Sequence, residues 1–131
     1  MIIKESAENY LETILMLRNT RGHVRSVDIA NELNFTKASV SVAMKHFREE
    51  GYITTGPDGD IALTDKGLAI AERVMERHNI IAKVLMRLGV DKDTAYEDSC
   101  KIEHDISDAS FEKIREFLER ESEENDTNGK I

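Results

Sequence analysis

The apolar positions at the start of this chain follow helical spacing. They recur every three or four residues through residues 4–19, and this spacing predicts an amphipathic helix. A second, short helix is predicted from an N-cap at Ser26. A tight turn separates it from a third helix over residues 36–50, which Thr36 caps and Gly51 follows. The first fifty residues therefore predict three helices, the second and third joined by a turn.

The pattern then changes to two short runs of β-prone residues. These runs, 52–55 and 60–63, flank a Gly-Pro-Asp-Gly turn and predict a β-hairpin. Helical spacing returns in residues 64–88 and 91–106, and a last helix is predicted from a cap at Ser107 or Asp108.

This order of elements predicts a mainly α protein in two parts. Two short helices joined by a turn, with a hairpin directly after the second, are typical of a winged helix-turn-helix. We assign that DNA-binding domain to residues 1–70 and a helical domain to residues 71–122. Residues 123–131 are predicted to form a disordered tail.

The charge of the chain is divided unevenly between these parts. The net charge is −8, yet residues 89–131 hold 14 acidic and 6 basic side chains, so the first 88 residues carry no net charge. The first 88 residues can therefore approach phosphate, whereas the acidic residues 89–131 are suited to binding cations. A single cysteine excludes an internal disulfide, and no apolar run approaches the ~20 residues that span a bilayer. We expect a cytoplasmic protein that binds no membrane.

The third predicted helix has the composition of a DNA-reading helix. Its apolar stripe consists of Val40, Met44 and Phe47. Short hydroxyl side chains let a helix enter the major groove, and lysine or arginine can reach phosphate or guanine. The candidate DNA-binding residues are Thr36, Lys37, Ser39, Ser41, Lys45 and Arg48. The predicted wing, residues 54–60, carries no basic residue, so we expect only weak phosphate contacts from it.

A second group of residues has the spacing of metal ligands. In Cys100-x-x-Glu103-His104 the three side chains share one face of a helix. A thiolate, a carboxylate and an imidazole together suit a transition-metal ion better than calcium or magnesium. One helix seldom completes a coordination shell, and the further candidates are Asn9, Glu12 and His78.

Spacing alone leaves other interpretations of these residues open. A single cysteine in a helix is more often a small core residue than a ligand. Glu12 also fits a solvated helix carboxylate, and His78 an ordinary core or surface histidine. We assign no metal role to His23, in a loop, or to His46, on the exposed side of the third helix.

Two other classes of function are also compatible with the motifs. One is a winged-helix regulator that senses a non-metal ligand or a partner protein. The other is a metalloenzyme built on Cys100, Glu103 and His104. A hydrolytic site needs a substrate cleft, for which the chain has little material beyond its predicted helices and hairpin. We therefore predict no enzymatic activity and no small-molecule substrate.

Five motifs in one order carry a family resemblance: Glu8-Asn9-Tyr10-Leu11-Glu12-Thr13-Ile14, Val27-x-Ile29-Ala30, Leu63-Thr64-x-Lys66-Gly67, Arg77-His78 and Cys100-x-x-Glu103-His104. Through them residues 5 to about 120 resemble the metal-dependent repressors, which comprise the diphtheria-toxin and iron-dependent repressors and the manganese transport regulators. The resemblance implies that residues 71–122 form a metal-binding and dimerisation domain. It also implies a homodimer that binds palindromic double-stranded operator DNA and represses metal-uptake genes.

The resemblance further implies a ligand set and a class of ion. The matching positions are Asn9, Glu12, His78, Cys100, Glu103 and His104. The ion is Mn²⁺ or Fe²⁺, with Co²⁺, Ni²⁺ or Zn²⁺ able to replace it in vitro. Glu12 matches the manganese branch and Cys100 the iron branch, so the physiological metal stays open between them. Ala82 and Tyr96 stand where the iron branch places ancillary ligands, and an ancillary site of that form is therefore not expected.

Overall fold

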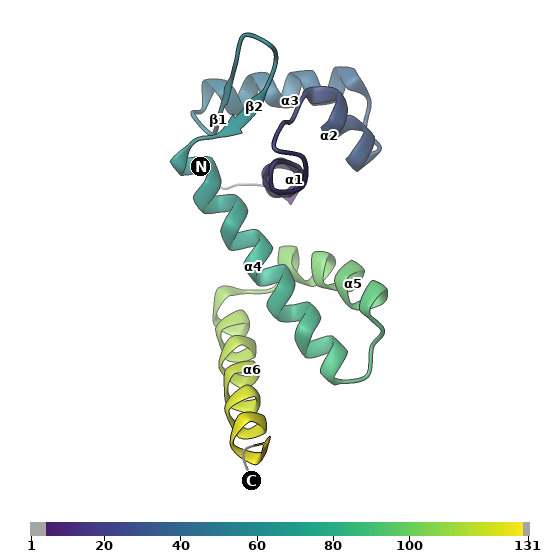
Figure 1. Ribbon diagram of the computed structural model, residues 1–131, viewed down its shortest axis with the longest axis vertical. Helices are drawn as coiled ribbons and strands as arrows, with labels where there is room; N and C mark the ends of the chain where they lie inside the picture. Colours follow the sequence, from purple (N-terminus) through teal and green to yellow (C-terminus); the bar gives the residue numbers. More distant parts are fainter. Residues whose placement is uncertain (1–4, 130–131) are drawn as a thin grey trace. The chain divides into compact units, whose positions relative to one another are not determined.

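A computed structural model describes residues 5–129 of the chain, with side chains from residue 7 to residue 123. The described part holds six helices and one pair of strands (Figure 1). In chain order these are α1 (Glu5–Arg21), α2 (Ser26–Leu33), α3 (Lys37–Glu49), β1 (Ile53–Thr55), β2 (Ile61–Leu63), α4 (Asp65–Arg87), α5 (Lys92–Asp105) and α6 (Asp108–Gly129). The predicted mainly α fold, with a winged helix-turn-helix at its start, is confirmed.

The chain divides into two compact units, Met1–Val74 and Met75–Ile131, and the division falls within α4. The sequence predicted a boundary after residue 70 and a tail from residue 123. Helix α6 runs to Gly129, and residues 130–131 lie outside the described part of the chain. None of the described helices combines the length and the apolar character that crossing a bilayer requires.

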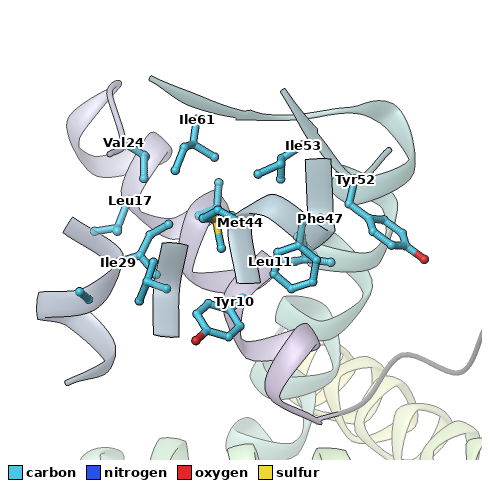
Figure 2. Packing of buried hydrophobic residues seen from close by; sticks show 14 residues of the cluster. Tyr10, Leu11, Leu17, Val24, Ile29, Met44, Phe47, Tyr52, Ile53 and Ile61 are labelled. Carbon is cyan, nitrogen blue, oxygen red and sulfur yellow. The ribbon is translucent and has the colours of Figure 1, made fainter. Parts of the chain in front are cut away.

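The first unit is built around a hydrophobic core shared by its helices and its hairpin (Figure 2). Tyr10 of α1 packs edge-to-face against Phe35 and Phe47, with ring centroids 5.6 and 5.7 Å apart, and Phe47 packs in the same way against Tyr52. Burial raises the pKa of the Tyr10 phenol. Its fully buried members include Leu11, Ile14, Val24, Ile29 and Val40. These contacts hold α3 in place against α1 and α2.

The turn between α2 and α3 depends on a few backbone features. Asn34 ends α2 with a φ of 58°, in the left-handed region that asparagine tolerates. Thr36 caps α3, as predicted, because its side chain accepts a hydrogen bond from the Ser39 amide. The predicted cap at Ser26 is wrong by one residue. Arg25 precedes the helix, and its amide donates to the Asp28 carboxylate, which takes over the capping.

The hairpin and the start of α4 are joined to the end of α3. Strands β1 and β2 pair antiparallel, with Ile53 opposite Leu63, and are one residue shorter at their starts than predicted. Thr64 donates from its hydroxyl to the Gly51 carbonyl at 2.6 Å and accepts from the Gly67 amide. A Cβ at Gly67 would collide with the Tyr52 carbonyl, so this close approach requires glycine. The Leu-Thr-x-Lys-Gly motif thus fixes the hairpin to α4.

The second unit combines a small apolar core with buried charge. Its buried apolar residues are Ile81, Ala82, Ala95, Phe111 and Leu118. The guanidinium groups of Arg77 and Arg115 lie over the Phe111 ring, 4.5 and 5.2 Å from its centre. Asp91 caps α5 by accepting from the Thr94 amide, and this hydrogen bond holds the pKa of the Asp91 carboxyl below its usual range. Ser107 caps α6 in the same way through the Ser110 amide.

Candidate metal centre and nucleic-acid interface

Helices α4 and α5 bring three potential metal ligands together in the second unit. The ligand atoms of His78, Cys100 and His104 all lie within 4.8 Å of one another. Cys100 Sγ is 3.9 Å from His104 Nε2, and the two imidazole rings are 6.3 Å apart in an edge-to-face arrangement. Cys100 and His104 are four residues apart, which places them one turn apart on one face of α5. His78 comes from α4, so the cluster joins two helices.

Glu103 lies beside this cluster and is almost completely buried, at 4% exposure. One carboxylate oxygen is 2.9 Å from His104 Nδ1, and the other is 3.6 Å from Arg77 Nε. Arg77 also donates to the Asp108 carboxylate at 2.7 Å and to the Ile106 carbonyl at 3.4 Å. The contact with Glu103 leaves Nε2 of His104 facing the Cys100 sulfur.

The donors and their spacing fit a divalent transition metal. Nitrogen and sulfur ligands lie about 2.0–2.3 Å from an ion such as zinc, so two donors of one ion stand about 3–4 Å apart. The 3.9 Å between Cys100 and His104 agrees with this separation. Two imidazoles and a sulfur exclude a site of the calcium or magnesium type, which is built from oxygen ligands.

The remaining predicted ligands lie in the first unit. Asn9 and Glu12 are half-buried on α1, three residues apart, and their part in a metal site stays a prediction. His23 and His46, to which the sequence assigned no metal role, also lie in this unit. His23 contacts the carboxylates of the wing, and His46 is exposed on α3.

Helix α3 exposes every residue predicted to bind DNA: Thr36 as its cap, then Lys37, Ser39, Ser41, Lys45 and Arg48. Three of them, Thr36, Ser39 and Arg48, also have structural partners. The Thr36 hydroxyl donates to the Ser39 hydroxyl at 2.9 Å, and Arg48 donates to the Thr55 hydroxyl on β1 at 3.3 Å. Opposite this face, Val40, Met44 and Phe47 are buried as predicted. The helix therefore presents hydroxyl and cationic groups on a side that the core leaves open.

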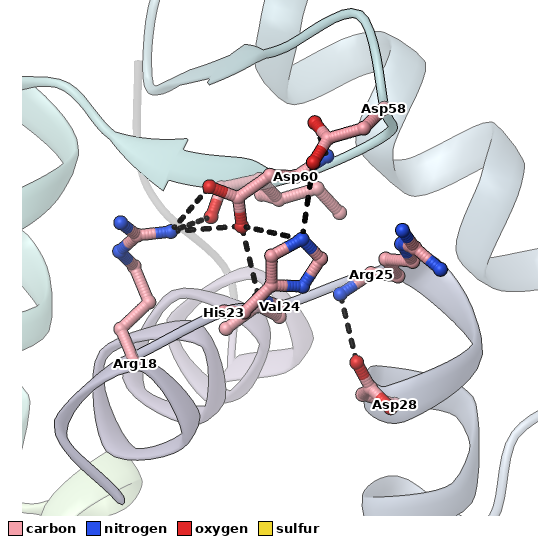
Figure 3. A network of polar contacts seen from close by, with 8 residues as sticks. Arg18, His23, Val24, Arg25, Asp28, Asp58 and Asp60 are labelled. Atoms are coloured by element: carbon pink, nitrogen blue, oxygen red, sulfur yellow. Dashed lines mark hydrogen bonds and ion pairs between the residues drawn. The ribbon is translucent and has the colours of Figure 1, made fainter. Parts of the chain in front are cut away.

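The wing is anchored by a network that sequence reasoning missed (Figure 3). Asp60 accepts hydrogen bonds from the Val24 amide at 3.0 Å and from the Arg18 guanidinium at 3.1 Å. Arg18 donates in addition to the Ile61 carbonyl at 2.8 Å, and His23 lies 3.3 Å from Asp58. No local sequence pattern predicts these contacts, because Arg18 and Asp60 are 42 residues apart in the sequence.

The same network also lowers the pKa values of the two wing carboxyls. The Val24 amide, followed by Arg18, holds the pKa of Asp60 below its usual range. The Asp60 amide, followed by His23, lowers the pKa of Asp58. Both carboxylates therefore stay ionised and pair with groups from α1 and the loop after it. The wing carries acid in place of the lysine or arginine that would bind phosphate.

Two family descriptions match almost the whole chain. Residues 3–61 match the iron-dependent repressor N-terminal DNA-binding domain, and residues 64–129 match the iron-dependent repressor metal-binding and dimerisation domain. The chain is 32% identical to an uncharacterized HTH-type transcriptional regulator of Methanocaldococcus jannaschii, over 90% of this chain and 96% of that one. It is 30% identical to the HTH-type transcriptional regulator MntR of Lysinibacillus sphaericus, over 87% and 82% of the two chains.

Solved structures give the same result for the fold. The chain superposes on T. acidophilum IdeR with a TM-score of 0.78 and 25% identity, over 85% of this chain and 53% of that one. For the manganese regulator SloR the TM-score is 0.75 and the identity 26%, over 91% and 55%. The chain thus spans about half the length of these two proteins.

The fold and these matches define a transcriptional regulator in which a winged helix-turn-helix precedes a helical metal-binding and dimerisation domain. The chain belongs to the iron-dependent repressor family of metal-dependent transcriptional repressors.

Proposed function

We propose that this protein binds palindromic operator DNA as a homodimer when Mn²⁺ or Fe²⁺ is bound, and thereby represses genes of metal-ion uptake. The observation that carries the proposal is the cluster of His78, Cys100 and His104 in the domain that matches the family's metal-binding domain. The manganese regulator SloR, to which the chain is similar, supports Mn²⁺, and the iron-dependent repressor domains that the chain matches support Fe²⁺.

In this proposal His78, Cys100 and His104 hold the ion, together with Glu103 and with Asn9 and Glu12 of α1. A bound divalent ion supplies positive charge and coordination bonds to donors on separate helices. Cys100 binds as the thiolate. Ligands from more than one helix make ion binding sensitive to how those helices are arranged.

Operator binding depends on the distance between two copies of α3 in a dimer. A palindromic site presents its half-sites about 34 Å apart, one helical turn of DNA. We propose that the apoprotein samples many separations and that ion binding favours the one that fits. A 100-fold gain in operator affinity corresponds to about 2.7 kcal/mol of coupling, which is within the usual range for allosteric proteins.

The donor set does not select one metal by affinity alone. Binding to nitrogen and sulfur ligands generally strengthens from Mn²⁺ through Fe²⁺ and Co²⁺ to Cu²⁺, so the weaker-binding physiological ions must be selected by geometry and availability. We therefore expect several ions to bind in vitro and a subset of them to activate operator binding.

The proposal is tested by measuring operator affinity while Mn²⁺, Fe²⁺, Co²⁺ and Zn²⁺ are titrated separately. Mn²⁺ or Fe²⁺ is expected to raise the affinity of the full chain by roughly 100-fold, and His104→Ala is expected to abolish this gain. His46→Ala provides a matched histidine control that keeps the ratio of affinities with and without metal. An unchanged metal response in His104→Ala would remove the cluster from the mechanism.

Equilibrium dialysis separates this proposal from a regulator that senses something else. A winged-helix regulator of a non-metal ligand or a partner protein predicts no tight metal site in the wild-type chain. Tight Mn²⁺ binding that is lost in His104→Ala, and kept in His46→Ala, supports the proposed site.

A further inference from the structure

His23 connects the wing to the loop that precedes α2. Its Nε2 lies 3.3 Å from the Asp58 carboxylate and 3.9 Å from the Asp60 carboxylate (Figure 3). The backbone holds the hairpin against the same loop, since the Ile61 amide donates to the Val24 carbonyl at 2.7 Å. Only a charged imidazole forms an ion pair with the two carboxylates. The contacts of His23 are therefore the part of this attachment that depends on a proton.

Of the four charged groups in this attachment, His23 is the one that changes its charge between pH 5 and pH 8. Arg18 stays positive, and the contacts that lower the pKa values of Asp58 and Asp60 keep both carboxylates negative. Histidine is the side chain whose charge ordinarily changes in this range. The group thus holds one positive and two negative charges when the imidazole is neutral, and two of each when it is protonated.

Three further charged side chains lie on the loop and on the adjoining ends of α1 and α2. Arg21 of α1 pairs with Asp28 of α2 at 3.2 Å, and Arg25 lies on the loop itself. Arginine and aspartate ordinarily keep their charge between pH 5 and pH 8. A change in the attachment of the wing over this range is therefore assigned to His23.

The wing also adjoins the face of α3 that is predicted to bind DNA. Arg48 of α3 donates to the Thr55 hydroxyl of β1 at 3.3 Å. The Asp58 side chain is 59% exposed, and charges interact over about 8 Å at physiological ionic strength. Carboxylates at this position repel the phosphates of a bound duplex, and an imidazolium paired with them offsets the repulsion.

We infer that protonated His23 holds the acidic wing against the loop before α2 and offsets its charge, so that operator binding strengthens as the pH falls from 8 to 6. His23 is a positioning residue here, because it acts on DNA through Asp58 and the wing. Its contribution is present when the imidazole is protonated and is lost as the pH rises and the imidazole becomes neutral. The effect on DNA rests on the proposed function, whereas the attachment of the wing does not.

The first measurement is amide hydrogen exchange of the metal-free full chain at pH 6 and pH 8. The Val24 amide, which donates to the Asp60 carboxylate, reports the attachment of the wing. In His23→Gln this amide is expected to exchange about threefold faster than in the wild type at pH 6, and at the same rate at pH 8. Comparing both proteins at one pH cancels the direct effect of pH on exchange.

His46→Gln, at an exposed histidine of α3, is the matched control for this measurement. Its Val24 amide is expected to exchange as in the wild type at both pH values. Equal exchange rates in the wild type and His23→Gln at pH 6 would overturn the inference, and so would an equal acceleration in His46→Gln.

The second measurement is the affinity of the full chain for an operator selected from random duplex DNA, with Mn²⁺ saturating at each pH. Metal binding itself depends on pH, so the readout is the ratio of wild-type to His23→Gln affinity at one pH. The ratio is expected to be about 1 at pH 8 and about fourfold at pH 6, because a dimer has two wings and an exposed ion pair contributes about twofold.

Asp58→Asn shows whether His23 acts through the wing. In this background the effect of His23→Gln at pH 6 is expected to fall below twofold, because the carboxylate nearest to the imidazole is absent. An effect that stays fourfold in Asp58→Asn would mean that His23 contacts DNA directly, and it would overturn the positioning role.

Failure of the proposed function has a different signature. In that case no duplex binds in a metal-dependent manner, while the exchange of the Val24 amide still responds to His23→Gln at pH 6. A metal-dependent operator that the wild type and His23→Gln bind equally well at pH 6 overturns the effect of His23 on DNA and leaves the proposed function in place.

Discussion

The two units of this protein bury different kinds of side chain. The core of the first unit is formed by aliphatic and aromatic residues of α1, α2, α3 and the hairpin (Figure 2). In the second unit Arg77, Ser99 and Glu103 are buried beside a much smaller apolar set. Apolar burial is stabilising without any partner of specific charge, whereas a buried ion pair depends on every charge that surrounds it.

This difference agrees with the separate roles of the DNA-binding and metal-binding domains. A DNA-reading surface needs a rigid support whose stability does not vary with the ligand state. A sensor needs an arrangement of charges whose energy changes when a cation binds. Glu103 contacts both Arg77 and His104, so its electrostatic energy depends on the positive charge nearby and changes when a cation binds. We therefore expect substitutions in the second unit to respond to metal and substitutions in the core of the first unit not to respond.

The largest expected effect is that of Arg77→Met, which removes the cation beside Glu103. The exposed fraction of Arg77 is 5%, so the free energy of unfolding of the apoprotein is expected to fall by about 3–5 kcal/mol. Saturating Mn²⁺ is expected to restore more stability in the variant than in the wild type, because the ion replaces the lost positive charge. Urea unfolding of both proteins, with and without Mn²⁺, measures this difference.

The matched control lies in the core of the first unit. Ile29→Ala, at a fully buried position of α2, is expected to lower the free energy of unfolding by about 3 kcal/mol. Mn²⁺ is expected to add the same stability to this variant as to the wild type. If Mn²⁺ stabilises Arg77→Met and Ile29→Ala by equal amounts, the contrast between the two units is wrong. The Glu103 carboxylate then does not interact with the charge of the ion.

The next prediction concerns acid and the wing. Because the folded-state pKa of Asp60 is lowered, its charged form contributes stability that is present above the unfolded pKa of about 3.9. That stability is lost as the pH falls through the lower, folded pKa. Asp60→Asn is therefore expected to lower Tm most near neutral pH, and its curve should approach that of the wild type as the pH falls through the folded pKa of Asp60.

Thermal unfolding of the apoprotein at a series of pH values checks this expectation. Glu32→Gln, at an exposed carboxylate of α2, is the control and is expected to follow the wild-type curve throughout. A constant difference in Tm between Asp60→Asn and the wild type from pH 7 to pH 3 would show that the Asp60 charge does not stabilise the wing.

Local patterns in the sequence were sufficient to predict the helices and strands. They were insufficient to predict the contacts between distant segments. The helices follow from the spacing of apolar residues, and the shared face of Cys100 and His104 follows from helical periodicity. The anchor between Arg18 and Asp60, and the contact of Arg77 with Asp108, depend on how remote segments pack. Neither has a signature within a window of a few residues.

The exposure of Val42 on α3 is different, because the periodicity of a helix is enough to predict it. In the run Ser39-Val40-Ser41-Val42-Ala43-Met44 the apolar residues are easily assigned together to the core. Helical geometry places Val42 opposite Val40 and Met44, and the structure confirms that it is exposed.

The smallest expected effect tests the open face of α3 through salt. Lys45 is exposed beside Val42, and if it neutralises one phosphate in each half-site, Lys45→Ala lowers the slope of log affinity against log salt by about two per dimer. Lys113→Ala, at an 80% exposed lysine of the second unit, is the control and is expected to leave the slope unchanged. A slope that is unchanged in Lys45→Ala, with a preference relaxed at one base pair, would instead assign Lys45 to guanine. Either result keeps DNA contact with α3, whereas equal binding by both variants and the wild type at every salt concentration would exclude Lys45 from the interface.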